Sequence, residues 1–267
     1  MLAREQIEDL VQLHAVAERF AAEVTIIGAA ALLCFVELGR FTRDVDLVVA
    51  LDLEDFSALS AALKACGWTQ PPGREHRWFA PGGSLIDLMP AGPNLRAARR
   101  IVWPESQFAM SLAGFEHVFA HSVAIQFAPN VWFKVAPPPV VALLKIVAYT
   151  DDPHRRQKDL DDLKWLLRIY EAKSDRFFGD DVFAADLEDF EYTNAFLLGS
   201  DIGAIATDED AGIVHGFLRG HYIPTEELAE LDPEDFLERD TLRFHMQLRA
   251  FEKGFDSVRP PHPGPVI

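Results

Sequence analysis

The sequence contains little cysteine and little positive charge. Its two cysteines, Cys34 and Cys66, lie in apolar surroundings and lack the spacing of a metal or redox site. With no sign of a disulfide framework, a reducing cytoplasm is the simplest interpretation. Twenty-five Lys and Arg stand against 42 Asp and Glu, so the net charge is −17. Such acidity disfavours extensive non-specific binding to nucleic acid, because that affinity comes largely from contacts of Lys and Arg with phosphate.

A long hydrophobic run is also absent. The most apolar stretch, residues 24–39, is interrupted by two glycines. It is shorter than the roughly 20 apolar residues that cross a bilayer. The first 20 residues carry acidic side chains where a signal peptide would have a basic and then an apolar region. We therefore expect a soluble, cytoplasmic protein without a membrane partner.

Core-forming residues, in contrast, are plentiful. Hydrophobic residues make up 49% of the chain and aromatic residues 11%, which excludes a disordered or low-complexity protein. The acidity is uneven: residues 1–150 contain 12 Lys and Arg against 15 Asp and Glu, whereas residues 151–267 contain 13 against 27. The first half is thus compatible with a polyphosphate ligand, and the second half could offer a surface to a basic partner.

The first half has the pattern of a mixed sheet with helices. Short apolar or β-branched runs predict strands at 24–28, at 43–51, in a hairpin over 76–92, at 116–128 and at 131–136. Helices are expected over 4–20, over 29–39 after a turn at Gly28, and from Asp52 or Asp55 to about Gly67.

After residue 137 the pattern becomes helical. The prolines at 137–139 mark the change, since proline can open a helix but disrupts its interior. Apolar residues then recur at steps of three and four in the segments 140–149, 158–170, 183–198 and 239–254. We predict an α/β (α+β) fold: a small mixed-sheet core over 1–136, a helical C-terminal domain over 137–257 and a flexible tail over 258–267.

Three acidic residues fall in the predicted strands. Asp44 and Asp46 are two apart, so their side chains project to the same face. Like charges there cost energy unless a cation compensates them, and Mg²⁺ prefers oxygen ligands. Asp87 lies in a second apolar run, and if the two strands are neighbours the three acids could hold two Mg²⁺ ions for phosphoryl transfer. The alternative is that Asp44 and Asp46 are solvated at a strand end.

Further residues offer groups for an anion. The backbone N–H groups at Gly28 could face a phosphate, or Gly28 could make a plain tight turn. Arg40 and Thr42 supply a guanidinium and a hydroxyl just ahead of the acids, or they are solvated.

A second polar group falls in the helical half. Lys145 is a lone cation in an apolar segment, which favours a partner for it. Asp159 and Asp162 are three apart and face one way on a helix. They could orient Lys145, bind a nucleotide or be solvated.

Together these motifs resemble the nucleotidyltransferase superfamily, which includes DNA polymerase beta and the aminoglycoside nucleotidyltransferases, and within it the AbiEii-type toxins. The resemblance covers about residues 24–170. The matching residues are Gly28-Ala29, Arg40-x-Thr42-x-Asp44-x-Asp46, Ile86-Asp87-Leu88, and Lys145, Lys158, Asp159 and Asp162 in the segment 138–167.

The resemblance implies a role for each matched residue. Asp44 and Asp46 would be Mg²⁺ ligands, and Asp87 would activate the acceptor hydroxyl and complete the metal site. The turn residues Gly28 and Ala29, together with Arg40 and Thr42, would hold the triphosphate. Lys145 would reach its β- and γ-phosphates, with Asp159 and Asp162 beside it. Residues 1–136 would be the catalytic domain.

The sequence departs from the family pattern at two places. Ala29 stands where the family has Gly or Ser, which removes a possible hydroxyl contact to a phosphate but leaves the backbone amide. Asp151, Asp152 and Pro153 replace an expected basic residue, although Arg155 and Arg156 follow and could substitute.

Three functional hypotheses follow. The resemblance implies a Mg²⁺-dependent enzyme that moves a nucleoside monophosphate from an NTP to an acceptor hydroxyl, as the toxin of a type IV toxin–antitoxin pair with a cognate antitoxin and tRNA or other RNA as acceptor. Arg96, Arg99 and Arg100 could meet RNA, although a solvated helix face is the better interpretation. The second hypothesis makes the acceptor a small molecule or a protein. The third is a nucleotide-binding homologue without catalysis.

Overall fold

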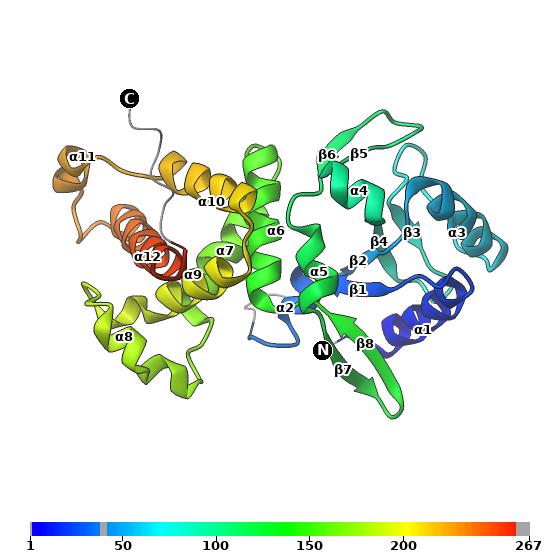
Figure 1. The fold of residues 1–267 in the computed structure, drawn as a ribbon, viewed down its shortest axis with the longest axis horizontal. Coiled ribbons are helices and arrows are strands. Elements are labelled where there is room, and N and C mark those ends of the chain that lie inside the picture. Colours follow the sequence, from blue (N-terminus) through cyan, green and yellow to red (C-terminus); the bar gives the residue numbers. More distant parts are fainter. Residues whose placement is uncertain (1, 38–41, 260–267) are drawn as a thin grey trace. The chain divides into compact units, whose positions relative to one another are not determined.

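The computed structural model describes residues 2–37 and 42–259 of the chain (Figure 1). The chain divides into two compact units, Met1–Leu144 and Lys145–Ile267, called here the N-terminal and the C-terminal unit. The α+β fold class predicted from the sequence is confirmed: a mixed sheet comes first and a helical region follows. None of the described helices is long and apolar enough to cross a membrane.

A six-stranded sheet forms the centre of the N-terminal unit. Its strand order is β3-β4-β2-β1-β8-β7. The strands are β1 Val24–Ile27, β2 Asp44–Val49, β3 Arg77–Phe79, β4 Leu85–Pro90, β7 Val123–Ala128 and β8 Val131–Val135. The pairs β2–β4 and β1–β8 are parallel, and the other neighbours are antiparallel. The sheet is therefore mixed, as the pattern predicts. A small second sheet pairs β5 Arg100–Val102 with β6 Ala109–Ser111.

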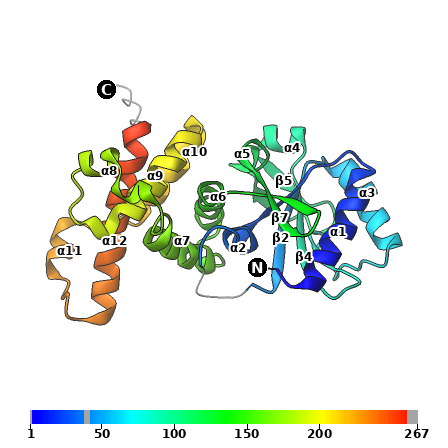
Figure 2. The ribbon, with the colours of Figure 1, turned by 90° about the horizontal axis from the view of Figure 1, so that it is seen from below.

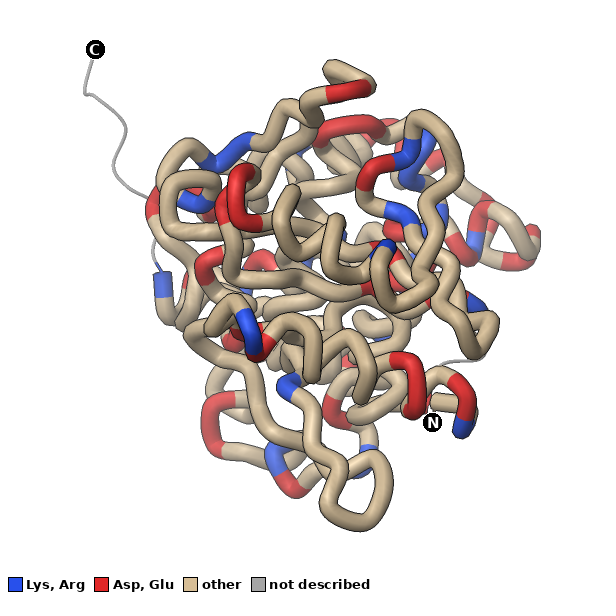
Figure 3. Tube along the Cα trace, turned by 90° about the vertical axis from the view of Figure 1, so that its right-hand side faces the viewer, with Lys and Arg blue, Asp and Glu red and all other residues tan. Residues whose placement is uncertain are grey.

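Five helices accompany this sheet in the described residues. They are α1 Arg4–Glu18, α2 Gly28–Leu32, α3 Leu53–Ala65, α4 Pro93–Ala98 and α5 Phe115–His121. Helices α1 and α3 lie side by side (Figure 2). Leu13 of α1, Leu59 of α3 and Leu47 of β2 are fully buried, so the apolar face of each element supplies the core. Lys, Arg, Asp and Glu are interspersed along the trace in Figure 3.

The described residues of the C-terminal unit form helices joined by loops. Helix α6 Pro138–Asp151 contains the division between the units. It is followed by α7 Gln157–Ile169, η1 Asp175–Phe178, α8 Asp180–Ala184, η2 Phe190–Tyr192, α9 Thr193–Ile205, α10 Asp208–Gly220, α11 Thr225–Glu230 and α12 Phe236–Val258. Helices α9 and α12 approach backbone to backbone: a Cβ at Gly254 would overlap the carbonyl oxygen of Phe196, and one at Gly199 would overlap that of Phe251.

Three expectations about secondary structure are wrong. The helical segment expected over 183–198 is interrupted, because residues 185–189 are not helical and Phe190–Tyr192 form η2. Residues 115–121 form helix α5 and not the start of a strand at 116. Phe115 and Val118 are buried one turn apart, and a short apolar run cannot be assigned from its periodicity alone. Helix α2 ends at Leu32 and so is shorter than the predicted 29–39. Most of the predicted flexible tail, 260–267, lies outside the described residues.

Candidate active site

The three aspartates lie on two neighbouring strands. Asp44 and Asp46 occupy β2, and Asp87 occupies β4, which runs parallel to it. Asp46 is directly opposite Asp87 in the strand register. Residues opposite each other in a sheet share a face, and Asp44 joins that face because it is two residues from Asp46. The structure therefore brings Asp44, Asp46 and Asp87 together on one face of the sheet.

Arg77 contacts two of these carboxylates. It lies on β3, opposite Asp87 in the antiparallel register of the predicted hairpin. Its Nε and Nη2 atoms donate hydrogen bonds of 2.7 and 2.6 Å to Oδ1 and Oδ2 of Asp87, and Nη2 lies 3.7 Å from Oδ2 of Asp44. The hydrogen bonds to Asp87, aided by the charges of all three aspartates, raise the pKa of Arg77. Arg77 is thus the counter-ion of the acidic cluster.

Sequence reasoning missed Arg77. The hairpin over 76–92 was expected, but the opposition of Arg77 and Asp87 depends on which residues form its turn. Residues 80–84 make that connection between β3 and β4. Counting outward from this turn gives the pairs Phe79–Leu85, Trp78–Ile86 and Arg77–Asp87. A two-residue turn at Gly82-Gly83 would instead place Arg77 opposite Leu88, so the Arg77–Asp87 pair depends on the register that the connection 80–84 sets.

Gly28 lies against the second aspartate. Its φ of +66° belongs to the left-handed region, which favours glycine. A Cβ on Gly28 would overlap Oδ2 of Asp46. A glycine at position 28 therefore meets two requirements: a left-handed backbone conformation and a close approach of the main chain to a carboxylate. Ala29 follows in α2 and is buried.

Thr42 holds the first aspartate. Its Oγ1 lies 3.0 Å from the carbonyl oxygen and 3.0 Å from Oδ1 of Asp44, so the hydroxyl can donate to either. Arg40, which was predicted to bind phosphate, lies outside the described residues. The proposed contacts of Arg40, Thr42 and Gly28 with a triphosphate stay predictions.

Lys145, Asp159 and Asp162 form a separate group in the C-terminal unit. The lysine Nζ lies 2.8 Å from Oδ1 of Asp159 and 2.8 Å from Oδ2 of Asp162. Burial lowers the pKa of Lys145, but the two carboxylates outweigh it and raise the pKa above its ordinary value. Asp162 is buried, so it is not a solvated surface residue. The contacts match the alternative in which the two acids orient Lys145.

The loop that departs from the family pattern contains ion pairs of its own. Nε of Arg155 lies 3.9 Å from Oδ2 of Asp152. Nη1 of Arg156 lies 3.7 Å from Oδ2 of Asp159, the partner of Lys145. Arg156 thus contributes positive charge next to the lysine group.

The basic cluster at 96–100 is not one helix face, which corrects the expectation from the sequence. Helix α4 ends at Ala98, and Arg99 has a left-handed backbone conformation. Arg96 donates to the carbonyl of Ala91, and Arg99 donates to Glu116, at 2.7 and 2.8 Å. These two guanidinium groups are engaged within the N-terminal unit. The cluster therefore lacks the row of free cations that binds a nucleic-acid backbone.

Comparison with known proteins finds similar solved structures at low sequence identity. No family model and no curated protein matches the chain. Among solved structures, it is similar to an antigenic nucleotidyltransferase-like protein from Paracoccidioides brasiliensis, with 17% identity and a TM-score of 0.38 over 61% of this chain and 75% of that one. It is also similar to a candidate nucleotidyltransferase from H. pylori, with 14% identity and a TM-score of 0.38 over 98% and 100%. At such scores the likeness says nothing about activity, which must be argued from the residues.

Proposed function

We propose that the protein is a Mg²⁺-dependent nucleotidyltransferase that moves a nucleoside monophosphate from an NTP to an acceptor hydroxyl and releases pyrophosphate. The observation that carries the proposal is the placement of Asp44, Asp46 and Asp87 on one face of neighbouring strands. A glycine turn beside Asp46 supports it, because the main chain there approaches the acids closely.

The acidic cluster suits a divalent cation. Three carboxylates on one sheet face repel one another unless positive charge lies among them, and here Arg77 supplies such charge to Asp87 and Asp44. Asp44 and Asp46 would hold Mg²⁺, with Asp87 completing the site. Bound Mg²⁺ would stabilise the charge that develops on the transferring phosphoryl group and on the leaving pyrophosphate.

The protein side chains have separable tasks in this proposal. Thr42 orients Asp44 through its hydroxyl. Arg77 holds both oxygens of Asp87 and so orients this carboxylate, which would accept the proton of the acceptor hydroxyl once the guanidinium releases one oxygen. Lys145 stays protonated between Asp159 and Asp162 and is the cation proposed for the β- and γ-phosphates.

The acceptor and the biological role are further parts of the proposal. The resemblance to AbiEii-type toxins supports a toxin with a cognate antitoxin and an RNA acceptor such as tRNA. The engagement of Arg96 and Arg99 within their own unit favours the second candidate, a small-molecule or protein acceptor, because it leaves less free positive charge for RNA.

Radiolabelled NTPs test the chemistry and the acceptor together. The protein is incubated with each α-labelled NTP, Mg²⁺ and total RNA, and both pyrophosphate release and label in RNA are measured. We expect release with the wild type and loss of at least a hundredfold with Asp44→Ala or Asp87→Ala. Glu54→Gln, an exposed acid on α3, is the matched control. Activity that survives both aspartate substitutions refutes catalysis at this site, and label that stays out of RNA refutes the RNA acceptor.

A further inference from the structure

Four phenylalanines gather on the surface of the C-terminal unit. They come from η1, α8 and η2, and they are Phe177, Phe178, Phe183 and Phe190, called here the aromatic surface. Phe178 and Phe183 are each 64% exposed, and Phe190 is 40% exposed. Scattered exposed apolar residues need no explanation, but a contiguous group of large ones marks an interaction site.

The rings of the aromatic surface are in mutual contact. The ring centre of Phe190 lies 4.8 Å from that of Phe177, 5.7 Å from that of Phe178 and 6.1 Å from that of Phe183. Phe190 is thus the centre of one cluster built from three short elements. Three of its four members are exposed and Phe177 is half-buried, so the cluster presents aromatic surface to solvent.

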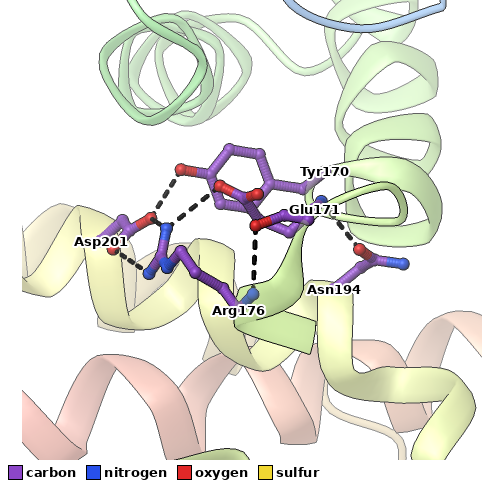
Figure 4. A network of polar contacts seen from close by, with 6 residues as sticks. Tyr170, Glu171, Arg176, Asn194 and Asp201 are labelled. Atoms are coloured by element: carbon purple, nitrogen blue, oxygen red, sulfur yellow. Dashed lines mark hydrogen bonds and ion pairs between the residues drawn. The ribbon is translucent and has the colours of Figure 1, made fainter. Parts of the chain in front are cut away.

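A network of ion pairs and hydrogen bonds fixes the segment that carries these rings (Figure 4). Arg176, next to Phe177, donates to both oxygens of Asp201 at 2.7 and 2.8 Å. Tyr170 donates to the same carboxylate at 2.6 Å, and Arg176 also contacts Glu171 at 3.1 Å. Asp201 belongs to α9, so the network ties η1 to a core helix. A surface ordered before binding loses less entropy when a partner docks.

Negative charge surrounds the aromatic surface. Residues 174–192 contain seven acidic side chains and one basic one, Arg176, which the network already neutralises. All seven acids are exposed: Asp175, Asp180, Asp181, Asp186, Glu188, Asp189 and Glu191. An apolar centre with a polar rim is the usual anatomy of a protein interface, and here the rim is mainly acidic, with Arg249 of α12 paired to Glu188 at 3.1 Å.

We propose that the aromatic surface binds a basic segment of a partner protein, in which Arg or Lys alternates with apolar side chains. The apolar residues would cover the phenylalanine rings, and the cations would meet the acidic rim and the ring faces. A nucleic acid is disfavoured because the rim repels phosphate. A symmetric contact with a second copy of the chain is disfavoured because it would place the same acidic rim against itself.

A labelled peptide tests the proposal on the full-length protein. The probe is a 12-residue fluorescein-labelled peptide of alternating Arg and Leu, and the reference is the same peptide with Glu in place of Arg. Fluorescence anisotropy is measured at low and at high salt. We expect binding of the Arg peptide that weakens as salt rises, because salt screens exposed charges, and no binding of the Glu peptide.

Substituted variants distinguish binding at the aromatic surface from binding to any acidic part of the protein. Phe178→Ser with Phe183→Ser should weaken binding of the Arg peptide roughly tenfold or more, since buried aromatic anchors dominate interface energies. Phe236→Ser with Leu237→Ser is the matched control, because these residues are 70% and 73% exposed at the start of α12. Asp175→Asn with Asp180→Asn should keep the rings and reduce the salt dependence.

Several results would overturn the proposal. One is that the phenylalanine variant and its control bind the Arg peptide with the same affinity. Another is that the wild type binds the Glu peptide as tightly as the Arg peptide. An oligouridine probe that binds the wild type and not the phenylalanine variant would assign the surface to nucleic acid. A dimer seen by sedimentation velocity that the phenylalanine substitutions dissociate would assign it to a second copy.

Discussion

Arg77 and Asp87 lie opposite each other on β3 and β4 and share two hydrogen bonds, of 2.7 and 2.6 Å. Both side chains are largely shielded from solvent, with exposures of 23% and 15%. A paired contact of this kind between a guanidinium and a carboxylate fixes orientation as well as charge. The acidic cluster therefore contains its own cation, and a bound metal ion would compete with this guanidinium for the carboxylates.

Removal of Arg77 tests that relationship. Arg77→Gln should lower the stability by about 1–3 kcal/mol, because it removes the positive charge among three carboxylates. The same change should tighten Mg²⁺ binding roughly tenfold, the equivalent of about 1.4 kcal/mol, since no guanidinium competes for Asp87. Thermal unfolding with and without Mg²⁺ measures both effects. Arg74→Gln, an exposed arginine in the preceding loop, is the control. The same Mg²⁺-induced rise in Tm for the wild type and for Arg77→Gln would contradict the prediction.

Gly28→Ala separates the two reasons for a glycine at this turn. Gly28 and Gly73 have nearly the same φ, +66° and +69°, but only a Cβ at Gly28 would meet a carboxylate. Both substitutions should cost about 1 kcal/mol for the left-handed backbone. Gly28→Ala should in addition displace Asp46 and weaken Mg²⁺ or Mn²⁺ binding at least tenfold. Urea unfolding and a Mn²⁺ titration followed by electron paramagnetic resonance make the comparison, and equal metal affinities of the two variants would speak against the close approach.

Lys145 is predicted to stabilise the C-terminal unit. Lys145→Met removes the lysine cation from Asp159 and from the buried Asp162, which should cost about 3–5 kcal/mol. Lys145→Met combined with Asp162→Asn should recover part of this loss. If the double variant is no more stable than the single one in urea, the energetic coupling of the pair is refuted.

The direction of the Lys145 pKa shift predicts how its contribution to stability depends on pH. The pKa of Lys145 is raised by folding, so its contribution is complete below its ordinary value of 10.5 and is lost only as the pH rises through the higher value of the folded state. The stability difference between the wild type and Lys145→Met should therefore stay constant between pH 7 and pH 9. A difference that shrinks over this range would show that the lysine loses its proton there.

Sequence reasoning succeeded where one element carried the pattern. The alternation in β2 places Asp44 and Asp46 on one face, and the apolar run around Asp87 marks a strand, so both strands could be predicted. Arg77 could not be predicted because its position depends on the register between two strands. Helix α5 was assigned to a strand because a segment of only seven residues, with four apolar side chains, fits either period.

Alanine substitutions at Gly254, where α12 contacts α9, and at Gly212 in α10 should change the stability in opposite directions. A Cβ at Gly254 would overlap the carbonyl oxygen of Phe196, and a helix backbone cannot move aside as a side chain can. Gly254→Ala should therefore force the helices apart and cost about 1–3 kcal/mol or more. Gly212 lies inside α10 with nothing within 4 Å of a Cβ, so Gly212→Ala should stabilise by about 0.5–1 kcal/mol. Urea unfolding of both variants decides the matter: a Gly254→Ala variant as stable as the wild type would mean that α9 and α12 are not in backbone contact, and a destabilised Gly212→Ala variant would contradict the open space at that position.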